Sequence, residues 1–467
     1  MVPLSAAMQD LTTGSITRHL LKTTSFMLVT MIFQTLYLLI DLYWVGGLGK
    51  EAVAAVAIAG NLTFIVIAIS QMLGVGTTTL VSHAVGKQDR DRALLLFNQS
   101  LVLSLVVGAV FYLVSMLTLD AYVNGLSADS LTAQLAADYL RWFIPAMALQ
   151  FGIACMGAAL RGTGNFKPGM VVTTATVILN MILAPFLIFG WVSGVALGVA
   201  GAALSTLVAV AIGTIWLGWY FITPSAYLHL QPRSWTPRLG LWAQMLKIGL
   251  PAGAEFGLMA AYMFIVYVIT RPFGAAAQAG FGIGLRLIQA GFMPVVALGF
   301  SVAPVAGQNF GARHASRVRA TFTNAAALAS GLMIALTLVC QVASAPMVRV
   351  FSDDPGVIAV GSDYLRIISW TFTASGIVFV SSSMFQALGN TLPSLASSFI
   401  RILVVAIPVV WMSTRPGFEL RWIWYISAAS VVLQVALNVL LLRREYARRL
   451  NFQTAPLVQN SQTVPSS

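Results

Sequence analysis

The stretch Asp138-Tyr139-Leu140-Arg141 recurs unchanged as Asp363-Tyr364-Leu365-Arg366, at a shift of 225 residues. The same shift aligns the two halves of the chain without gaps from Lys22 to Pro168, and it carries Gly164-Asn165 onto Gly389-Asn390. Low-complexity apolar sequence can resemble itself, but it does not repeat polar residues in a fixed register. We therefore infer an internal duplication.

The composition of the chain is that of a membrane protein. Of 467 residues, 58% are hydrophobic and only 9% are charged, whereas a soluble domain has roughly 45–50% apolar and about 25% charged residues. The mean hydropathy of +0.86 agrees. This composition argues against soluble enzymes, disordered proteins and nucleic-acid binders. The net charge of +12 is then a matter of membrane topology, because Lys and Arg in loops orient a membrane protein.

Apolar segments of about 20 residues predict membrane-spanning helices. The predicted spans are residues 19–45, 53–82, 93–119, 134–160, 168–190, 197–222, 242–270, 276–306, 319–347, 360–386, 392–413 and 420–442. Each repeat contains six of these spans, an even number, so both copies start from the same side of the membrane. The predicted fold is an all-α polytopic membrane protein, with twelve transmembrane helices in two six-helix lobes related by a parallel repeat.

These spans divide the chain into four parts. We expect an N-terminal lobe at residues 1–222, a cytoplasmic linker at 223–240, a C-terminal lobe at 241–442 and a polar, disordered cytoplasmic tail at 443–467. Of the 26 Lys and Arg residues, 17 fall in segments on one side of the predicted spans and 5 on the other. This excess predicts a multi-pass protein of the cell inner membrane with both termini in the cytoplasm.

Two-lobed bundles built from repeats are typical of secondary transporters, in which substrate binds between the repeats. The competing interpretation is a two-fold scaffold without a transport role. A membrane-embedded enzyme would need a nucleophile–base or metal constellation, and a channel a repeated filter loop; the sequence offers neither. We expect a monomer with small organic compounds, ions and lipid as partners, and without cofactor, metal or nucleic acid.

Carboxylates inside the membrane are costly, and they are functional candidates by default. Of the 14 acidic residues, only Asp41 and Glu255 fall in the bodies of predicted helices. Gln34, Tyr37 and Asp41 are spaced three and four residues apart, so they share one helix face that should point into the lobe. Asp41 suits a group that takes up and releases a proton. The alternative is a structural carboxyl near the outer end of the helix.

Two further polar residues of the first lobe are candidates for the same site. Asn180 lies in the fifth predicted span, close to Pro185, and Thr206 lies in the sixth. Proline frees a backbone carbonyl that neighbouring groups must satisfy. Asn180 and Thr206 are therefore candidate members of a polar network with Asp41. The alternative is that they only make hydrogen bonds between helices.

In the second lobe, Glu255 follows Pro251 by one helical turn, and Arg286 and Arg401 are the two cations that look buried. These three residues are candidates for the substrate cavity, as is Gln34 in the first lobe. A purely structural Glu–Arg ion pair is the alternative. The repeats are not equivalent here, because the 225-residue shift places Val266 opposite Asp41 and Thr30 opposite Glu255.

Cysteine and histidine give no metal or redox signature. Cys155 and Cys340 lie in apolar runs and are expected to behave as small buried residues. The histidines are expected to be solvated, because none has the spacing of metal ligands. They are His19, His83, His229 and His314.

Three motifs resemble the multidrug and toxic compound extrusion (MATE) transporters. Residues 34–49 (QTLYLLIDLYWVGGLG) look like the first-helix signature of that family. Residues 161–165 (RGTGN) with Pro168 resemble its fourth-to-fifth helix loop, and residues 307–312 (GQNFGA) resemble its eighth-to-ninth helix motif. The resemblance extends over residues 15–445. It implies export of amphipathic, often cationic compounds in exchange for protons or sodium ions.

The resemblance also implies site residues. A first-helix aspartate, its neighbouring tyrosine, a fifth-helix asparagine and a sixth-helix threonine map to Asp41, Tyr37, Asn180 and Thr206. The fifth-helix aspartate of the family is replaced by Ala184. Hard cations require several oxygen ligands and negative charge, so this change favours protons over sodium.

A second departure concerns the first helix. Related sequences often carry a proline where Phe26 stands, and only the second repeat keeps one, Pro251. Bending of the first helix by that route is therefore not expected here.

Together these observations predict a secondary antiporter that exports amphipathic, cationic organic compounds in exchange for protons, with sodium disfavoured. The principal alternative is a lipid-linked precursor flippase of the same superfamily, in which a cationic cavity holds phosphate groups. Twelve helices and few buried cations argue against it, whereas Arg286 and Arg401 argue for it.

Overall fold

The computed structural model describes residues 8–127, 129–191, 194–223, 226–413, 415 and 417–452. These residues form fourteen α-helices and two short 3-10 helices, and no strand is found among them. Eleven helices are long and apolar enough to cross a membrane, and a bent pair raises the number to twelve. The predicted all-α polytopic fold is confirmed.

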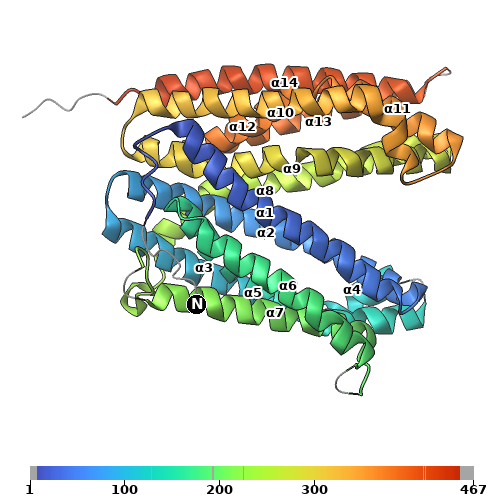
Figure 1. The fold of residues 1–467 in the computed structure, drawn as a ribbon, viewed down its shortest axis with the longest axis horizontal. Helices are drawn as coiled ribbons and strands as arrows, with labels where there is room; N and C mark the ends of the chain where they lie inside the picture. The colour runs from blue at the N-terminus through green and yellow to red at the C-terminus, as the bar shows by residue number, and fades with distance from the viewer. Residues whose placement is uncertain are drawn as a thin grey trace, which may run out of the picture.

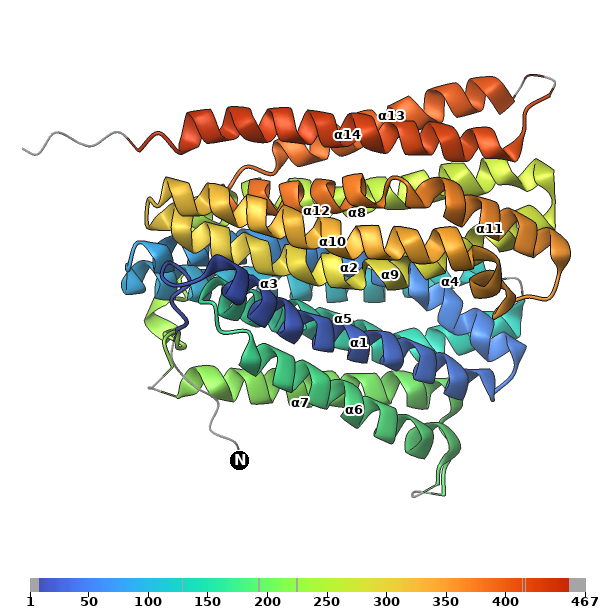
Figure 2. The ribbon, with the colours of Figure 1, turned by 45° about the horizontal axis from the view of Figure 1, so that its top comes forward.

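The helices form two lobes. Those of the first lobe are α1 (Ile16–Gly46), α2 (Lys50–Gly86), α3 (Arg90–Leu117), α4 (Leu119–Leu126), α5 (Ser130–Gly162), α6 (Lys167–Phe189) and α7 (Gly198–Ile222). Those of the second are α8 (Leu239–Thr270), α9 (Ala275–Gly311), α10 (Ala315–Arg349), α11 (Pro355–Ser369), α12 (Phe372–Ala387), α13 (Leu392–Ser413) and α14 (Leu420–Arg449). Figure 1 shows the first lobe below the second. In Figure 2, α6 and α7 lie at one edge of the molecule and α13 and α14 at the opposite edge.

The first helix of each lobe begins in the core of the other lobe. Ile16 and Leu20 of α1 are buried in a cluster with side chains of α9 and α10. Leu241 and Met245 of α8, which stand 225 positions later, are buried in the core of the first lobe. Packing therefore assigns the start of α1 to the second lobe, although the predicted boundary placed all of residues 1–222 in the first.

Polar caps fix where several helices begin. The carboxylate of Asp89 accepts the backbone N–H of Arg92 at 2.9 Å, and that of Asp129 accepts the N–H of Thr132 at 2.8 Å. Such caps satisfy donors that the first helical turn leaves unpaired. The hydrogen bonds from Thr132 also hold the pKa of Asp129, which lies outside the membrane-spanning segments, below its usual range. Asp129 therefore stays a charged acceptor.

The predicted span at residues 360–386 is present, but it is bent and not a single straight helix. The structure has α11 and α12 there, bent by 60° at a short break. Side chains of α10 donate hydrogen bonds to backbone carbonyls beside the break. Gln341 donates to the carbonyl of Arg366 at 2.7 Å, and Thr337 donates to that of Ser369 at 2.8 Å. Because another helix satisfies these carbonyls, the chain can turn without a proline or glycine at the break.

The last helix continues past its predicted end at residue 442. Helix α14 extends to Arg449, and the guanidinium of Arg449 donates to the carboxylate of Glu445 at 2.8 Å and to the carbonyl of Leu388 at 2.9 Å. The prediction that disorder begins at residue 443 is therefore wrong for 443–449. Residues 453–467 lie outside the described part of the chain.

The two lobes touch most closely at the end of the molecule where residue 8 and the end of α14 lie (Figure 1). A Cβ atom at Gly86 would overlap the backbone oxygen of Gln308, and one at Gly311 would overlap that of His83. Glycine is needed at both positions because two helix backbones meet there without room for a side chain. Gly86 and Gly311 are related by the 225-residue shift, so the same device occurs in both repeats.

The segment at residues 8–15, here called the N-terminal strap, joins the lobes at this closed end. The backbone N–H of Leu11 donates to Gln308 at 3.0 Å, and Asn309 donates to the carbonyl of Leu11 at 3.1 Å. On the first lobe, the N–H of Gln9 donates to the carbonyl of Thr163 at 3.1 Å. Leu11 is completely buried. The strap therefore ties both lobes into the closed arrangement.

Gln308→Ala is expected to lower the thermal stability of the purified protein. The Gln308 amide also donates to the carbonyl of Gly162 at 2.9 Å, so the change strands one buried donor and one buried acceptor. Each stranded group costs about 1–3 kcal/mol. A thermal melt in detergent measures the effect. Gln278→Ala, on the same helix, is the control, because its one hydrogen bond is exposed. Equal melting temperatures for the two variants would contradict the expectation.

Candidate functional site

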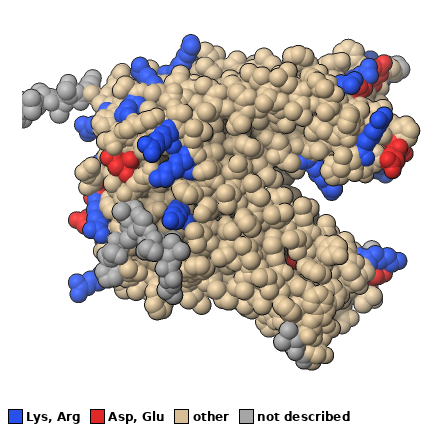
Figure 3. Space-filling model, in the orientation of Figure 1, with Lys and Arg blue, Asp and Glu red and all other residues tan. Residues whose placement is uncertain are grey.

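A wedge-shaped cleft opens between the lobes at the end of the molecule opposite residue 8 and the end of α14 (Figure 3). The burial of the helices locates its floor. On α9, no residue of 285–294 is buried, whereas every residue of 301–309 is. On α2, Val66 is the one buried residue in 61–72, whereas all of 73–79 are buried. The two lobes therefore lie apart along residues 285–294 of α9 and 61–72 of α2, and they pack together along residues 301–309 and 73–79.

A polar cluster lies inside the first lobe, where α1 packs against α6 and α7. The hydroxyl of Thr206 is its centre: the hydroxyl of Tyr37 lies 3.1 Å away, and the amide of Asn180 donates to it at 3.0 Å. Asn180 and Thr206 are both buried. The structure thus brings together three residues from three helices that the sequence predicted for one site.

Asp41 lies one helical turn from Tyr37 in the same cluster. Its side chain is 8% exposed, and its Oδ1 atom is buried without a hydrogen-bond partner among the described residues. None of the ion pairs in this part of the chain involves it. A buried carboxylate without a counter-charge is costly to keep ionised. The group can lower that cost by binding a proton or cation.

Gln34 does not share this environment. Its side chain is exposed, whereas Tyr37 is half-buried and Asp41 is buried. The prediction that all three point into the lobe is therefore wrong for Gln34. Helical spacing sets the direction of a side chain around the axis, but the neighbouring helices decide at which depth that face is covered.

Sequence reasoning did not single out Tyr139 of α5, a further buried tyrosine of the first lobe. The residue is 2% exposed, and its ring packs against Phe143. The residue stands in the repeated tetrapeptide at 138–141, which was the available signal. Ala184 is also buried in this lobe, so a methyl group occupies the position where the resemblance implied a second carboxylate.

The second lobe contains a different polar cluster around Glu255. The hydroxyl of Ser382 donates to Oε2 of Glu255 at 3.3 Å and lies 2.6 Å from the hydroxyl of Ser394. The other carboxylate oxygen is buried without a hydrogen-bond partner among the described residues. Glu255 therefore meets hydroxyl groups from α12 and α13, and no cationic side chain.

The structural Glu–Arg ion pair is not formed in the described part of the chain. Arg401 donates to Gln434 at 3.4 Å and lies over the ring of Tyr262 at 5.3 Å, while its Nε atom is buried without a partner there. Arg286 is exposed on α9, so the prediction that it is buried is wrong. Glu255 meets side chains of α12 and α13, whereas Arg401 meets side chains of α14 and α8. The sequence alone cannot specify these partners.

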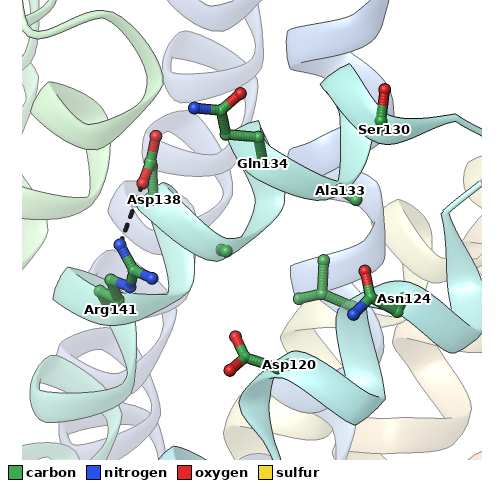
Figure 4. A pocket seen from close by; sticks show the side chains of 9 residues that line it. Asp120, Asn124, Ser130, Ala133, Gln134, Asp138 and Arg141 are labelled. Carbon is green, nitrogen blue, oxygen red and sulfur yellow. Dashed lines mark hydrogen bonds and ion pairs between the residues drawn. The ribbon is translucent and has the colours of Figure 1, made fainter.

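A separate pocket of about 350 Å³ lies between α4 and α5, and residues of both helices line it (Figure 4). On one side of the pocket, Nη1 of Arg141 lies 3.5 Å from Oδ1 of Asp138. None of the predicted site residues lines this pocket. The lining residues are Asp120, Val123, Asn124, Ser130, Ala133, Gln134, Ala137, Asp138 and Arg141.

The cysteines are free and buried, as predicted. The histidines differ from expectation. His314 is exposed and His19 is half-buried, with its ring 2.7 Å from the carbonyl of Thr13. His83 packs against Phe310, and its ring lies 2.6 Å from the carbonyl of Ala387 in the other lobe. The prediction of a solvated His83 is wrong because the lobes meet at that helix end. In the described residues, no group of three or more His, Cys, Asp or Glu side chains is placed to hold a metal.

Comparison with known proteins decides the family. The model of the MatE family matches residues 27–186 and again residues 251–412, which together make up more than half of the chain. This chain belongs to the MatE family. The two matched segments correspond to the two repeats inferred from the sequence.

Relatives of this MatE protein are named as multidrug resistance or transport proteins. It is 27% identical over 407 residues to the probable multidrug resistance protein YpnP of Bacillus subtilis, covering 85% of this chain and 88% of the relative. It is 23% identical over 371 residues to the FAD transporter of Shewanella oneidensis, covering 79% and 82%. The MatE protein is thus a multi-pass membrane transporter of a multidrug efflux family and not an enzyme.

Solved structures support the two-lobed fold. The MatE protein superposes with a TM-score of 0.86 on an outward-facing multidrug resistance MATE transporter of the MOP superfamily, at 23% identity, covering 94% of this chain and 98% of that one. At this identity the likeness shows the fold alone.

Proposed function

We propose that the protein is an antiporter that exports amphipathic organic compounds, cationic ones among them, in exchange for protons. In this proposal Asp41 binds the proton, and Tyr37, Asn180 and Thr206 form the network that responds to it. The carrying observation is the buried Asp41 carboxyl, which has an Oδ1 atom without a partner and no ion pair among the described residues.

The proposed coupling follows from the cost of that buried charge. When Asp41 binds a proton, the charge disappears, and the neighbouring hydroxyls can rearrange around a neutral group. When a cationic compound approaches, the ionised form gains a counter-charge, so the proton and the compound compete for one carboxyl. Such competition is the thermodynamic requirement of exchange. Sodium is disfavoured because Ala184 leaves the cluster with one carboxylate.

We further propose that the cleft in Figure 3 is the outward-facing substrate pathway. The supporting observation is that the start of α1 and the end of α14 lie at the opposite, closed end (Figure 1). The Lys and Arg distribution favours a cytoplasmic position for this end, in a cell inner membrane. Arg286, Arg401 and Glu255 belong to the second lobe's part of this pathway, and Gln34 to the first lobe's part. We expect a monomer to be sufficient.

The test uses purified protein in liposomes that contain a pH dye and have an acidic lumen. Adding the cationic dye rhodamine 123 outside should raise the luminal pH and load the dye, equally with and without sodium. A requirement for sodium would overturn proton coupling. Absence of both dye uptake and pH change would overturn the antiporter itself, and the lipid-linked flippase, which the cations Arg286 and Arg401 favour, would then become the better candidate.

A further inference from the structure

Arg161 stands in the last turn of α5, at the closed end of the molecule, but its guanidinium lies deeper in the membrane. A Cβ atom at Gly157, one turn back along α5, would lie 3.5 Å from Nη1, and one at Gly74 of α2 would lie 3.6 Å from Nη2. The guanidinium carbon lies 5.6 Å from the ring centre of Phe300 on α9. The charge is therefore held where three helices from both lobes meet.

This meeting point is the floor of the cleft. Gly74 is the second residue of the fully buried run 73–79 of α2, directly below the more open residues 61–72. Phe300 is half-buried and immediately precedes the fully buried run 301–309 of α9. Gly74 and Phe300, the neighbours of the guanidinium on α2 and α9, thus lie at the depth where the open cleft ends and the close packing of the two lobes begins.

No protein anion neutralises this charge in the described part of the chain. The ion pairs found there involve Lys50, Arg141, Arg421 and Arg449. The two carboxylates in the helix bodies lie elsewhere: Asp41 lies on α1, which packs against α6 and α7, and Glu255 contacts serine hydroxyls. An enclosed cation without a counter-ion is costly, and the contact with an aromatic ring offsets that cost only in part.

The surroundings suit an anionic group. A guanidinium presents N–H donors in a planar fork that matches a carboxylate or a phosphate. Gly74 and Gly157 have no side chains, so the space next to the guanidinium on these two sides is not filled by side-chain atoms. The ring of Phe300 adds an apolar surface on which the body of an amphipathic compound can pack.

We propose that Arg161 binds a carboxylate or phosphate group of the transported compound at the floor of the cleft. The substrate class then includes zwitterions and amphipathic anions as well as cations. Because Asp41 and Arg161 are separate charges in separate surroundings, a zwitterion can use both, whereas a simple cation uses the first alone. This inference rests on the proposed export function.

The test compares probes that differ only in the anionic group. Rhodamine 110 carries a free carboxylate, and rhodamine 123 is its methyl ester; flavin mononucleotide carries a phosphate that riboflavin lacks. In the liposome assay, Arg161→Gln should raise the KM for rhodamine 110 and for flavin mononucleotide by about tenfold or more, the loss expected for a charge-assisted hydrogen bond. The KM values for rhodamine 123 and riboflavin should change less than twofold.

Two further variants keep the test decisive. Arg161→Lys retains the charge and should restore part of the affinity for the anionic probes. Arg141→Gln, on the same helix but exposed and paired with Asp138, should leave every probe unchanged. Unchanged transport of rhodamine 123 by Arg161→Gln shows that the variant is folded.

Three results would overturn the inference. The wild-type protein could move rhodamine 123 but neither anionic probe; Arg161→Gln could weaken both members of a pair equally; or Arg141→Gln could have the same effect as Arg161→Gln. A wild-type protein that moves none of the four probes would overturn the proposed function as well. If only one anionic probe responds to Arg161→Gln, the bound group is that one, the carboxylate or the phosphate.

Discussion

Asp41→Asn is expected to abolish the pH change that rhodamine 123 evokes in liposomes, reducing it to the level of empty vesicles. Asparagine has nearly the same size and shape but cannot exchange a proton. Because Asp41 makes no ion pair in the described part of the chain and its Oδ1 atom has no partner there, an amide strands no cationic side chain. The loss should therefore fall on coupling and not on folding.

Asp120→Asn is the matched control, since Asp120 is exposed in the separate pocket of α4 and α5. This variant should retain full exchange. Asp41→Asn should elute like the wild type in gel filtration, and its melting temperature should be equal or higher, because a buried charge has been removed. Full proton exchange by folded Asp41→Asn would show that the proton binds elsewhere, with Glu255 the next candidate.

Gly249→Val is expected to prevent assembly of the two lobes. A Cβ atom at Gly249 of α8 would overlap the backbone oxygen of Met72 on α2. One turn later, a Cβ atom at Gly253 would lie 2.7 Å from the backbone oxygen of Ala68. Backbone atoms of two packed helices cannot move aside as a flexible side chain can, so the cost should reach about 3 kcal/mol or more.

The matched control is Gly257→Val on the same helix, because a Cβ atom there meets no atom within 4 Å. Gel filtration and thermal melts of fluorescently tagged protein in detergent should show loss of the folded protein for Gly249→Val and near-wild-type behaviour for Gly257→Val. Equal stability of the two variants would refute the close contact between α2 and α8.

Part of the candidate site was accessible from the sequence. In a chain with so few carboxylates, membrane depth alone singles out Asp41, and helical spacing places Tyr37 on nearly the same face. That Tyr37, Asn180 and Thr206 meet at one hydroxyl depends on how three helices pack. Tyr139 could not be singled out, because a tyrosine in an apolar helix usually signals packing and its complete burial is a tertiary property.

Arg161 shows the limit most clearly. The sequence places it at the end of a predicted span, in the motif RGTGN of residues 161–165. The long side chain of arginine spans more than one helical turn, so its charge lies beside Gly157 and Gly74 and not at the end of its own helix. Neither the direction of that side chain nor the cleft above it can be read from spacing.

Composition and the spacing of apolar and polar residues were enough to predict the approximate spans, the all-α class and the offset between the repeats. These are consequences of chain-local physics, because an apolar stretch must bury its backbone in a helix to cross a lipid bilayer. Tertiary packing was needed to show that α1 and α8 begin in each other's lobes, that the chain bends between α11 and α12, and that His83 and the N-terminal strap join the lobes. Each of these depends on contacts between segments far apart in the chain, whose partners no local pattern specifies.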